Sequence, residues 1–419
     1  MKKSVCVVGG GASGMLAAIA AARAGAAVTL LEQNNEAGKK IYMTGNGKCN
    51  LTNQDMTVSS YDTEKSKALV EKVLKAFGER ELVAFFEKEL GMRTVIKQGS
   101  GVYPASEAAA TVVDVLKRAL QSNQVLLKTQ TRVTAIRRMD ASFEIATDKG
   151  CLYADRVILS CGGKSFPKTG SNGSGFVLAK AAGLTLIPDY PALTAFVCQK
   201  DGMKLLSGLR QEAEVTLYID GSPVAKESGQ LQFTDYGISG IPVFQISNKA
   251  SRAFRDEQIN RQKKVKIQAA VNLFPNEEEE DVFKKLKKQL AQFANFPFED
   301  AMCGFLHKKW IDYFGKEYGF SEFLQAGEIS TERLRKLAGE LTAFTYTVKA
   351  VRGYDFCQVT GGGVSLSELD EHMQAVTIPG LYVTGEMLDV IGKCGGYNLQ
   401  WAFSTGMIAG SHAGSPQSR

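Results

Sequence analysis

A glycine-rich turn near the N-terminus constrains the fold of this chain more than any other feature. The pattern G-x-G-x-x-G falls on Gly9, Gly11 and Gly14, after the apolar run SVCVV and before the alanine-rich stretch 15–24. A second apolar run then ends at Glu32. This order predicts a strand, a tight turn, a helix and a second, parallel strand, which is the opening unit of a doubly wound α/β fold.

Each residue of this motif has a chemical role in binding a dinucleotide. Gly9 would make the turn, Gly11 would let a pyrophosphate approach the backbone, and Gly14 would let the helix pack closely on the strand. The N-terminus of the helix would direct its free N–H groups at the phosphates. Glu32 would accept the hydroxyl groups of an adenosine ribose and would disfavour a 2′-phosphate. The motif therefore predicts tightly held FAD or NAD, against the alternative of a glycine turn that binds no nucleotide.

Two further features favour FAD over NAD. Strand-like segments between 142 and 160 end in a CGG turn, an order that resembles FAD-binding domains of the glutathione-reductase type, in which a small β-meander crosses over the sheet. Near the C-terminus, the apolar segment GLYVTGE ends in Gly385 and Glu386. This segment resembles the second FAD signature, in which the acidic residue binds the ribitol. No second G-x-G-x-x-G follows a strand, so a separate nicotinamide domain is not expected.

Five segments together resemble one family, the BaiN/YhiN-like NAD(P)/FAD-dependent oxidoreductases, also known as aminoacetone-oxidase-like flavoproteins. These segments are VVGGGASGMLAAIAAA, GKKIYMTGNGKCNLTN, CGGKSFPKTGSNGSGFVLA, FTDYGISG and GEMLDVIGKCGGYNLQWAFSTG. The resemblance implies a glutathione-reductase-type Rossmann domain for FAD, built from residues 1–190 and 346–419. It also implies an inserted β-barrel-like domain over 191–275 and a small helix-rich domain over 276–345.

The motifs and the resemblance together give a set of candidate cofactor-binding residues. They come from the first glycine turn, the segment after Glu32, the later glycine turns and the start of the C-terminal helix. The set is Gly9, Gly11, Ala12, Ser13, Gly14, Glu32, Gln33, Lys39, Lys40, Gly45, Asn46, Gly47, Lys48, Val133, Gly162, Gly385, Glu386, Gly396, Tyr397 and Asn398. No catalytic side chain stands out.

The loop GNGKCNLTN, residues 45–53, contains a cysteine that has two interpretations. By the resemblance, the loop would run along the pyrophosphate towards the flavin, and Cys49 could face the ring as a thiol. The favoured alternative is a small buried residue, because a buried free cysteine behaves as a small hydrophobe. A redox pairing with Cys394 is a third and less favoured alternative.

Composition limits the other classes of function. The net charge of +6 is spread along the chain, so no nucleic-acid partner is expected. Eight cysteines without a C-x-x-C pair and three scattered histidines predict no metal site and suit a reducing cytoplasm. No apolar run approaches the length of a membrane span, and a glycine turn interrupts the one that resembles a signal peptide. The oligomeric state is not indicated.

We therefore expect a cytoplasmic FAD-dependent oxidoreductase that acts on a small molecule. In the favoured reaction, NAD(P)H is a diffusible co-substrate that reduces the flavin, and the flavin passes hydride to a small organic acceptor. One alternative is an oxidase of a small amine that uses oxygen and releases peroxide. Another is a flavoprotein that is not an enzyme and uses FAD as a redox sensor.

Overall fold

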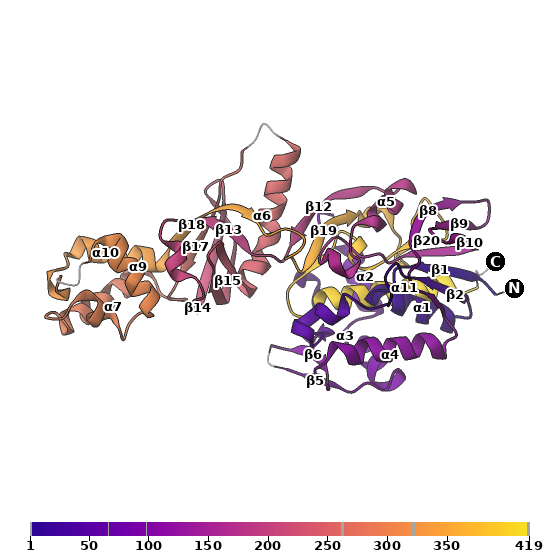
Figure 1. Cartoon of the computed structure of the whole chain (residues 1–419), viewed down its shortest axis with the longest axis horizontal. Helices are drawn as coiled ribbons and strands as arrows, with labels where there is room; N and C mark the ends of the chain where they lie inside the picture. Colours follow the sequence, from indigo (N-terminus) through magenta and orange to yellow (C-terminus); the bar gives the residue numbers. More distant parts are fainter. Residues whose placement is uncertain (1, 66, 98, 261–263, 321–323, 417–419) are drawn as a thin grey trace. The chain divides into compact units, whose positions relative to one another are not determined.

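The chain folds into two compact units. The computed structural model describes residues 2–65, 67–97, 99–260, 264–320 and 324–416. One unit contains residues 1–191 and 357–419, and the other contains residues 192–356. Each unit has its own hydrophobic core. Figure 1 shows both units, coloured along the sequence.

The first unit is built on a parallel sheet in which five strands are described, in the order β20-β11-β1-β2-β7. The strand pairs Val8–Leu31, Val8–Leu159 and Leu159–Val383 align the carboxyl ends of four of these strands at one edge. The residues that follow those strand ends therefore meet at this edge. The strands are β1 (Ser4–Val8), β2 (Ala27–Leu31), β7 (Leu126–Lys128), β11 (Arg156–Leu159) and β20 (Leu381–Val383).

The helix α1 (Ala12–Arg23) joins β1 to β2, so the predicted strand–turn–helix–strand unit and the Rossmann-type fold are confirmed. The C-terminal helix α11 (Tyr397–Gly414) packs along α1, as the yellow and indigo helices of Figure 1 show. A Cβ at Gly406, Gly410 or Gly414 would lie only 2.2–2.3 Å from a carbonyl oxygen of α1. Glycine at every fourth position is therefore what allows the two helices to touch.

The predicted β-meander is present, but its strands differ from the expectation. Antiparallel strands β8 (Val133–Arg138), β9 (Phe143–Thr147) and β10 (Gly150–Ala154) form it, whereas the segment RVIL is the strand β11 of the parallel sheet. All four residues of β11 are buried. Arg156 is buried with its guanidinium donating to the carbonyl oxygens of His412 and Ala413, and the other three residues are apolar. A short apolar run is typical of a parallel strand that is covered on both faces, which is why this segment joins the main sheet.

The other elements of the first unit are short strands and the helices that flank them. The helices are α2 (Ala68–Ala76), α3 (Glu79–Ala84), α4 (Ala109–Ser122) and α5 (Ser174–Ala181). The strands are β3 (Thr52–Asn53), β4 (Tyr61–Asp62), β5 (Thr94–Ile96), β6 (Gly101–Pro104), β12 (Leu186–Ala192), β19 (Val359–Val364) and β21 (Ile391–Gly392). The 3-10 turns η1 (Ile41–Gly47), η4 (Pro167–Thr169) and η8 (Gly385–Met387) lie in its loops.

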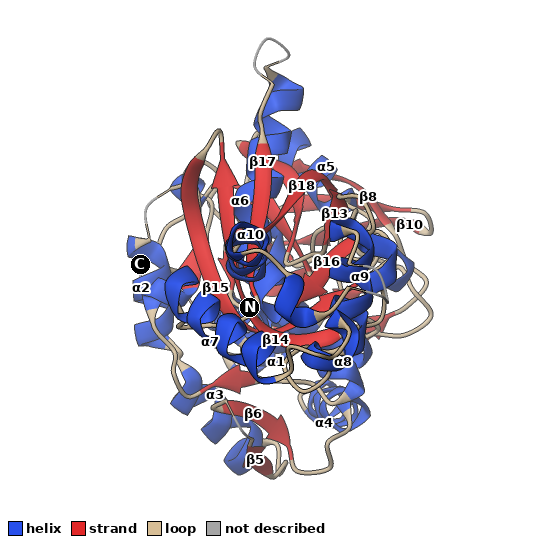
Figure 2. Ribbon diagram, turned by 90° about the vertical axis from the view of Figure 1, so that its left-hand side faces the viewer, coloured by secondary structure: helices blue, strands red, loops and turns tan. Residues whose placement is uncertain are grey.

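The second unit is a closed antiparallel barrel with helices, shown in red and blue in Figure 2. Asp220 and Gly221 make the turn of its long hairpin and both have positive φ, as a two-residue hairpin turn requires. The strands, in barrel order, are β13 (Phe196–Gln199), β16 (Gly237–Gly240), β15 (Ser222–Phe233), β14 (Arg210–Ile219), β17 (Ile267–Asn272) and β18 (Phe344–Val351). The helices are α6 (Ile241–Ile259), α7 (Glu279–Gln292), α8 (Phe298–Met302), α9 (Lys308–Tyr318) and α10 (Thr331–Thr342).

Two predicted domain boundaries are wrong. The barrel and the helices of residues 276–345 share one hydrophobic core and form one unit, so no boundary lies at 275. The strand β18, which begins at Phe344, pairs with β13 and β17 and so closes the barrel. Residues 346–356 therefore belong to the second unit, and the chain returns to the first unit at Cys357 rather than at residue 346. None of the helices in the described part of the chain is both long enough and apolar enough to span a membrane.

Candidate cofactor site

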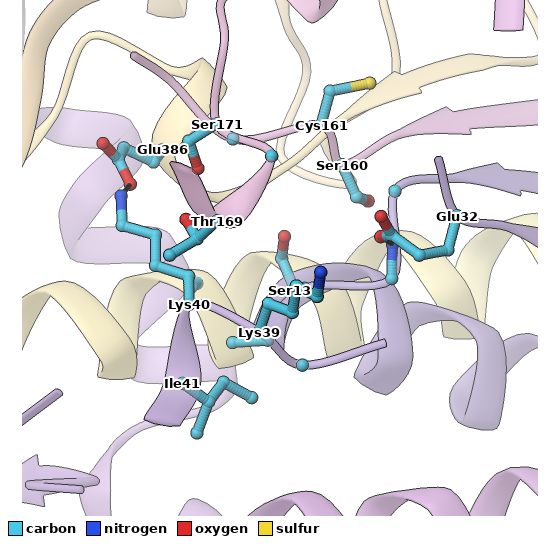
Figure 3. Close-up of a pocket in the computed structure, with 18 of the residues that line it drawn as sticks. Ser13, Glu32, Lys39, Lys40, Ile41, Ser160, Cys161, Thr169, Ser171 and Glu386 are labelled. Carbon is cyan, nitrogen blue, oxygen red and sulfur yellow. Dashed lines mark hydrogen bonds and ion pairs between the residues drawn. The ribbon is translucent and has the colours of Figure 1, made fainter. Parts of the chain in front are cut away.

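A cavity lies at the edge of the parallel sheet where the strands end. Gly9, Glu32 and Ser160, which directly follow β1, β2 and β11, all line it. In the close-up of Figure 3, Glu32 stands at one side, Lys40 and Glu386 stand at the other, and Ser13 and Lys39 lie between them. The cavity is therefore elongated across the N-terminus of α1.

The glycine turn brings backbone, rather than side chains, to this cavity. A Cβ at Gly14 would lie 1.8 Å from the carbonyl oxygen of Gly9, so Gly14 serves close packing between helix and strand. A Cβ at Gly11 would meet no atom within 4 Å, so the backbone of Gly11 borders open space. Since no side chain caps the start of α1, its first N–H groups are available to an anion.

Glu32 is buried, and three hydrogen bonds hold its carboxylate in place. The backbone N–H of Gly10 donates to Oε2 at 2.8 Å, and both the backbone and the side-chain amide of Asn34 donate to Oε1 at 2.8 Å. These donors offset the cost of burying the charge. A carboxylate offers roughly four acceptor positions, so one remains for a hydroxyl group of a ligand.

At the other end of the cavity, Glu386 joins three segments of the chain. Its Oε1 accepts from the hydroxyl of Ser165 at 2.6 Å and from the backbone N–H of Thr360 at 2.9 Å, and its Oε2 forms an ion pair with Lys40. Lys40 also donates to Ser165. An ammonium group has three N–H donors, so Lys40 keeps one for a ligand in the cavity.

The structure brings twelve of the twenty candidate residues to the cavity. Those that line it are Gly9, Gly11, Ala12, Ser13, Glu32, Gln33, Lys39, Lys40, Val133, Gly162, Glu386 and Asn398. Those that do not line it are Gly14, Gly45, Asn46, Gly47, Lys48, Gly385, Gly396 and Tyr397.

The loop 45–48 is the clearest difference from the expectation. Residues 45–48 are exposed, Gly45, Asn46 and Gly47 have positive φ, and Lys48 forms an ion pair with Glu107 at 2.9 Å. The glycines of this loop thus allow a left-handed turn on the surface instead of a close approach to a phosphate.

Gly385, which precedes Glu386, serves packing. A Cβ at this position would lie 2.6 Å from Oγ of Ser13. Its backbone N–H donates to Thr405 at 2.9 Å, and its carbonyl oxygen accepts from the indole of Trp401 at 3.2 Å. Gly385 is therefore packed between the start of α1 and α11.

At the start of α11, Gly396 and Tyr397 pack against other parts of the chain and do not line the cavity. A Cβ at Gly396 would lie 2.6 Å from the carbonyl oxygen of Thr52, and the ring of Tyr397 packs edge-on against Tyr61, with the ring centroids 6.1 Å apart. Asn398 lines the cavity, but its side-chain amide already exchanges two hydrogen bonds with the backbone of Gly392, at 2.8 and 2.9 Å.

None of the eight cysteines is in a disulfide bond. Among the described residues no group of His, Cys, Asp and Glu could hold a metal ion. Cys49 is fully buried, and burial raises the pKa of its thiol to about 12. Cys161 lines the cavity, where burial and, to a smaller extent, the nearby Glu32 raise the pKa of its thiol to about 12. Both thiols are therefore neutral near pH 7.

Sequence reasoning missed several residues of the site. Asn34, Cys161, Ser165, Thr360 and Trp401 either line the cavity or hold a side chain that does. Asn34 could have been found, because an asparagine two residues after a buried acid can bond that acid through both of its N–H groups. The others depend on contacts between distant segments.

These features fit FAD. The open backbone at Gly11 and the uncapped start of α1 suit a pyrophosphate, and Glu32 keeps an acceptor position for a ribose hydroxyl. Lys39 and Lys40 bring positive charge to the same cavity, which suits the two phosphate charges. An elongated cavity with these donors in this order suits an extended dinucleotide.

Comparison with known proteins agrees with this fit. The model of the HI0933-like protein Rossmann domain matches residues 3–412. A relative in Clostridium scindens, a 3-dehydro-bile acid delta(4,6)-reductase, is 38% identical over 410 residues, which are 97% of this chain and 98% of the relative. The ribosomal RNA dihydrouridine synthase of Escherichia coli is 25% identical over 411 residues, with 95% of each chain covered.

Among solved structures, a 3-ketosteroid delta1-dehydrogenase from Sterolibacterium denitrificans has the same fold. It aligns with a TM-score of 0.52 over 98% of this chain and 99% of its own, at 12% identity. At this level of identity the alignment shows the fold alone.

Proposed function

This chain belongs to the HI0933-like family of FAD-dependent oxidoreductases, and from that premise we propose that it reduces a carbon–carbon double bond conjugated to a carbonyl group. The substrate we propose is a 3-oxo steroid acid with double bonds at positions 4 and 6. The observation that carries this proposal is the 38% identity to the bile-acid reductase over 97% of the chain.

The two groups of relatives share one chemistry. In a 3-dehydro steroid, the double bonds at positions 4 and 6 are conjugated to the carbonyl at position 3. In uridine, the double bond that is lost in dihydrouridine is conjugated to a ring carbonyl. A conjugated carbonyl makes the far carbon of the double bond electron-poor, so that this carbon accepts a hydride and its neighbour accepts a proton. The reaction class is thus supported by relatives whose substrates differ widely.

The residues of the cavity have separate tasks in this proposal. Bound FAD would supply hydride transfer, for which a nicotinamide is the usual source of electrons. The start of α1 and Lys40 would hold the pyrophosphate, and Glu32 would hold the adenosine ribose. NADH or NADPH would then be a diffusible co-substrate, oxidised as one double bond gains a hydride and a proton.

An anaerobic titration tests the proposal. NADH and NADPH are added in turn to the purified holoprotein while the visible flavin bands are followed, and a 3-oxo-4,6-diene bile acid is then added. We expect one nicotinamide to bleach the bands, the steroid to restore them, and the product to gain two hydrogens for each double bond reduced. Reduced flavin that the steroid does not reoxidise would refute the proposed substrate. Bleaching by a small amine, with peroxide formed in air, would support the oxidase alternative instead.

A second candidate substrate is a uridine in ribosomal RNA. It is favoured by the relatives in Escherichia coli and Haemophilus influenzae, which are 25% and 26% identical over 95% of this chain. It ranks second because both identities are well below that of the steroid reductase. Incubating the reduced protein with unmodified ribosomal RNA and measuring dihydrouridine by mass spectrometry tests it. A positive result would overturn the expectation that the chain has no nucleic-acid partner.

A further inference from the structure

Residues 161–174, which we call the strap, lie along the cavity between β11 and α5. The strap contains the glycine-rich sequence CGGKSFPKTGSNGS and the 3-10 turn η4. Gly162, Thr169, Gly170, Ser171 and Ser174 of the strap line the cavity. A ligand in the cavity would therefore have the strap as one of its walls.

One end of the strap is anchored beside Glu386. The backbone N–H groups of Lys164 and Ser165 donate to Oγ1 of Thr360 at 2.7 and 3.1 Å, and the Ser165 hydroxyl donates to Glu386. A Cβ at Gly163 would lie 2.4 Å from the same Thr360 oxygen. Charge-assisted hydrogen bonds and close packing fix this end firmly.

Residues 169 and 170, in the second half of the strap, are held beside Glu32 by two side-chain amides. Nε2 of Gln33 donates to the carbonyl oxygen of Gly170 at 2.7 Å, and Nδ2 of Asn34 donates to that of Thr169 at 3.0 Å. Gly170 has φ +101°, and a Cβ there would lie 2.4 Å from Nδ2 of Asn34. We call these two hydrogen bonds the latch.

The contacts of residues 163–165 with Thr360 and Glu386, which we call the anchor, include a hydrogen bond to a carboxylate, whereas the latch does not. The latch is therefore weaker than the anchor, and it forms without any ligand. Both of its bonds join a neutral amide to a backbone carbonyl, and both are only partly buried. Such bonds hold the strap closed independently of any ligand, and the loss of one changes an opening equilibrium by about fivefold. The strap should therefore open at the latch and pivot at the anchor.

From this asymmetry we propose that Gln33 and Asn34 are positioning residues that latch the strap over the adenosine end of FAD. The latch sets how fast FAD is taken up and released. This inference rests on the proposed FAD site in the same cavity. It assigns Gln33 a role in closing the site, in place of the direct cofactor contact expected from the sequence.

Kinetics of FAD exchange test the latch without any measurement of turnover. Release is followed by the rise of flavin fluorescence when the holoprotein is diluted, and uptake is followed by adding FAD to the apoprotein. We expect Q33A and N34A each to speed both processes by about fivefold, and the double variant by about 25-fold. Because uptake and release change together, the dissociation constant of Q33A should change far less than its rates.

The control is N172A, which removes an asparagine amide from the same strap. Asn172 is exposed, and its side chain accepts from the backbone of Ser174. Its backbone N–H, which alanine keeps, donates to the carbonyl oxygen of Gly170 at 2.9 Å, so N172A leaves the groups of the latch in place. Its exchange rates should stay within about twofold of those of the parent protein. N34A also removes a donor from Glu32, so its dissociation constant should rise as well, and Q33A is the cleaner variant.

The outcomes separate the latch from the site on which it rests. Parental exchange rates in Q33A, in a protein that binds FAD, would overturn the latch alone. Faster release with unchanged uptake would also overturn it, because it would show Gln33 to be a contact of FAD and not a gate. A protein that takes up no FAD would overturn the proposed site and the latch together.

Discussion

Gly410 of α11 lies so close to Ala17 of α1 that a Cβ at Gly410 would stand 2.2 Å from the Ala17 carbonyl oxygen. Gly406 and Gly414 repeat this relationship one turn to either side, with 2.3 Å in each case. The C-terminal helix therefore fixes the helix whose first turn borders the cavity. Residues from the two ends of the sequence thus pack together beside the G-x-G-x-x-G turn.

Replacing Gly410 by valine should lower the free energy of unfolding of the first unit by about 1–3 kcal/mol or more, which is the cost of overpacking a core. The cost arises because the new side-chain atoms would meet the rigid backbone of α1. Urea unfolding measures this. Trp401 lies in the first unit and Trp310 in the second, so a W310F background makes tryptophan fluorescence report the first unit.

The matched control for this substitution is S411V, which places the same valine at an exposed position of the same helix. Its free energy of unfolding should stay within about 0.5 kcal/mol of the parent value. If G410V were as stable as S411V, the close packing of α11 on α1 would be wrong.

Lys40 and Lys48 should differ in their effect on the affinity of the protein for FAD. Lys40 lines the cavity and keeps a free donor, so K40M should raise the FAD dissociation constant by roughly 10- to 150-fold, as expected for a hydrogen bond to a charged group. Lys48 is exposed and pairs with Glu107, so K48M should change it by less than about twofold. Titration of the apoproteins with FAD, followed by fluorescence quenching, gives both values. An equal loss of FAD affinity in both variants would mean that residues 45–48 do contribute to the binding site.

The parts of the fold that the sequence predicts are those encoded by residues close together in the chain. The strand–turn–helix–strand unit follows from the spacing of Gly9, Gly11 and Gly14, and the acid at its end is Glu32. Hydrophobic runs and glycine turns act over a few residues, so they can be read without the tertiary structure.

The errors arise where distant segments decide the outcome. Residues 344–351 look like any short apolar strand, and only pairing with β13, some 150 residues earlier, places them in the barrel. The latch between Gln33 and Gly170 spans 137 residues. Nothing local in GNGKCNLTN shows that Lys48 turns towards Glu107 and leaves the cavity.

The thiol of Cys49 should be inert in the folded protein. It is fully buried, and burial raises its pKa to about 12, so almost none of it is thiolate near pH 7. Brief alkylation of the native protein, followed by peptide mass spectrometry, should modify the exposed Cys151 and Cys303 and spare Cys49 until the chain is unfolded. Modification of Cys49 as fast as that of Cys151 would favour the reactive, flavin-facing interpretation instead.

His412 should make the protein less stable in mild acid. Burial, followed by the stacked ring of His372 and by Arg156, lowers its pKa below the ordinary value of 6.5, and Tyr382 contacts its Nδ1 at 2.9 Å. Below about pH 6.5 the unfolded chain therefore binds a proton that the folded chain resists. The free energy of unfolding should fall with pH in this window, by at most about 1.4 kcal/mol per pH unit for one proton. H412N, which cannot take up that proton, should show a shallower fall in urea unfolding between pH 7.5 and 5.5. Because both proteins share every other ionisable group, equal slopes would mean that His412 does not contribute.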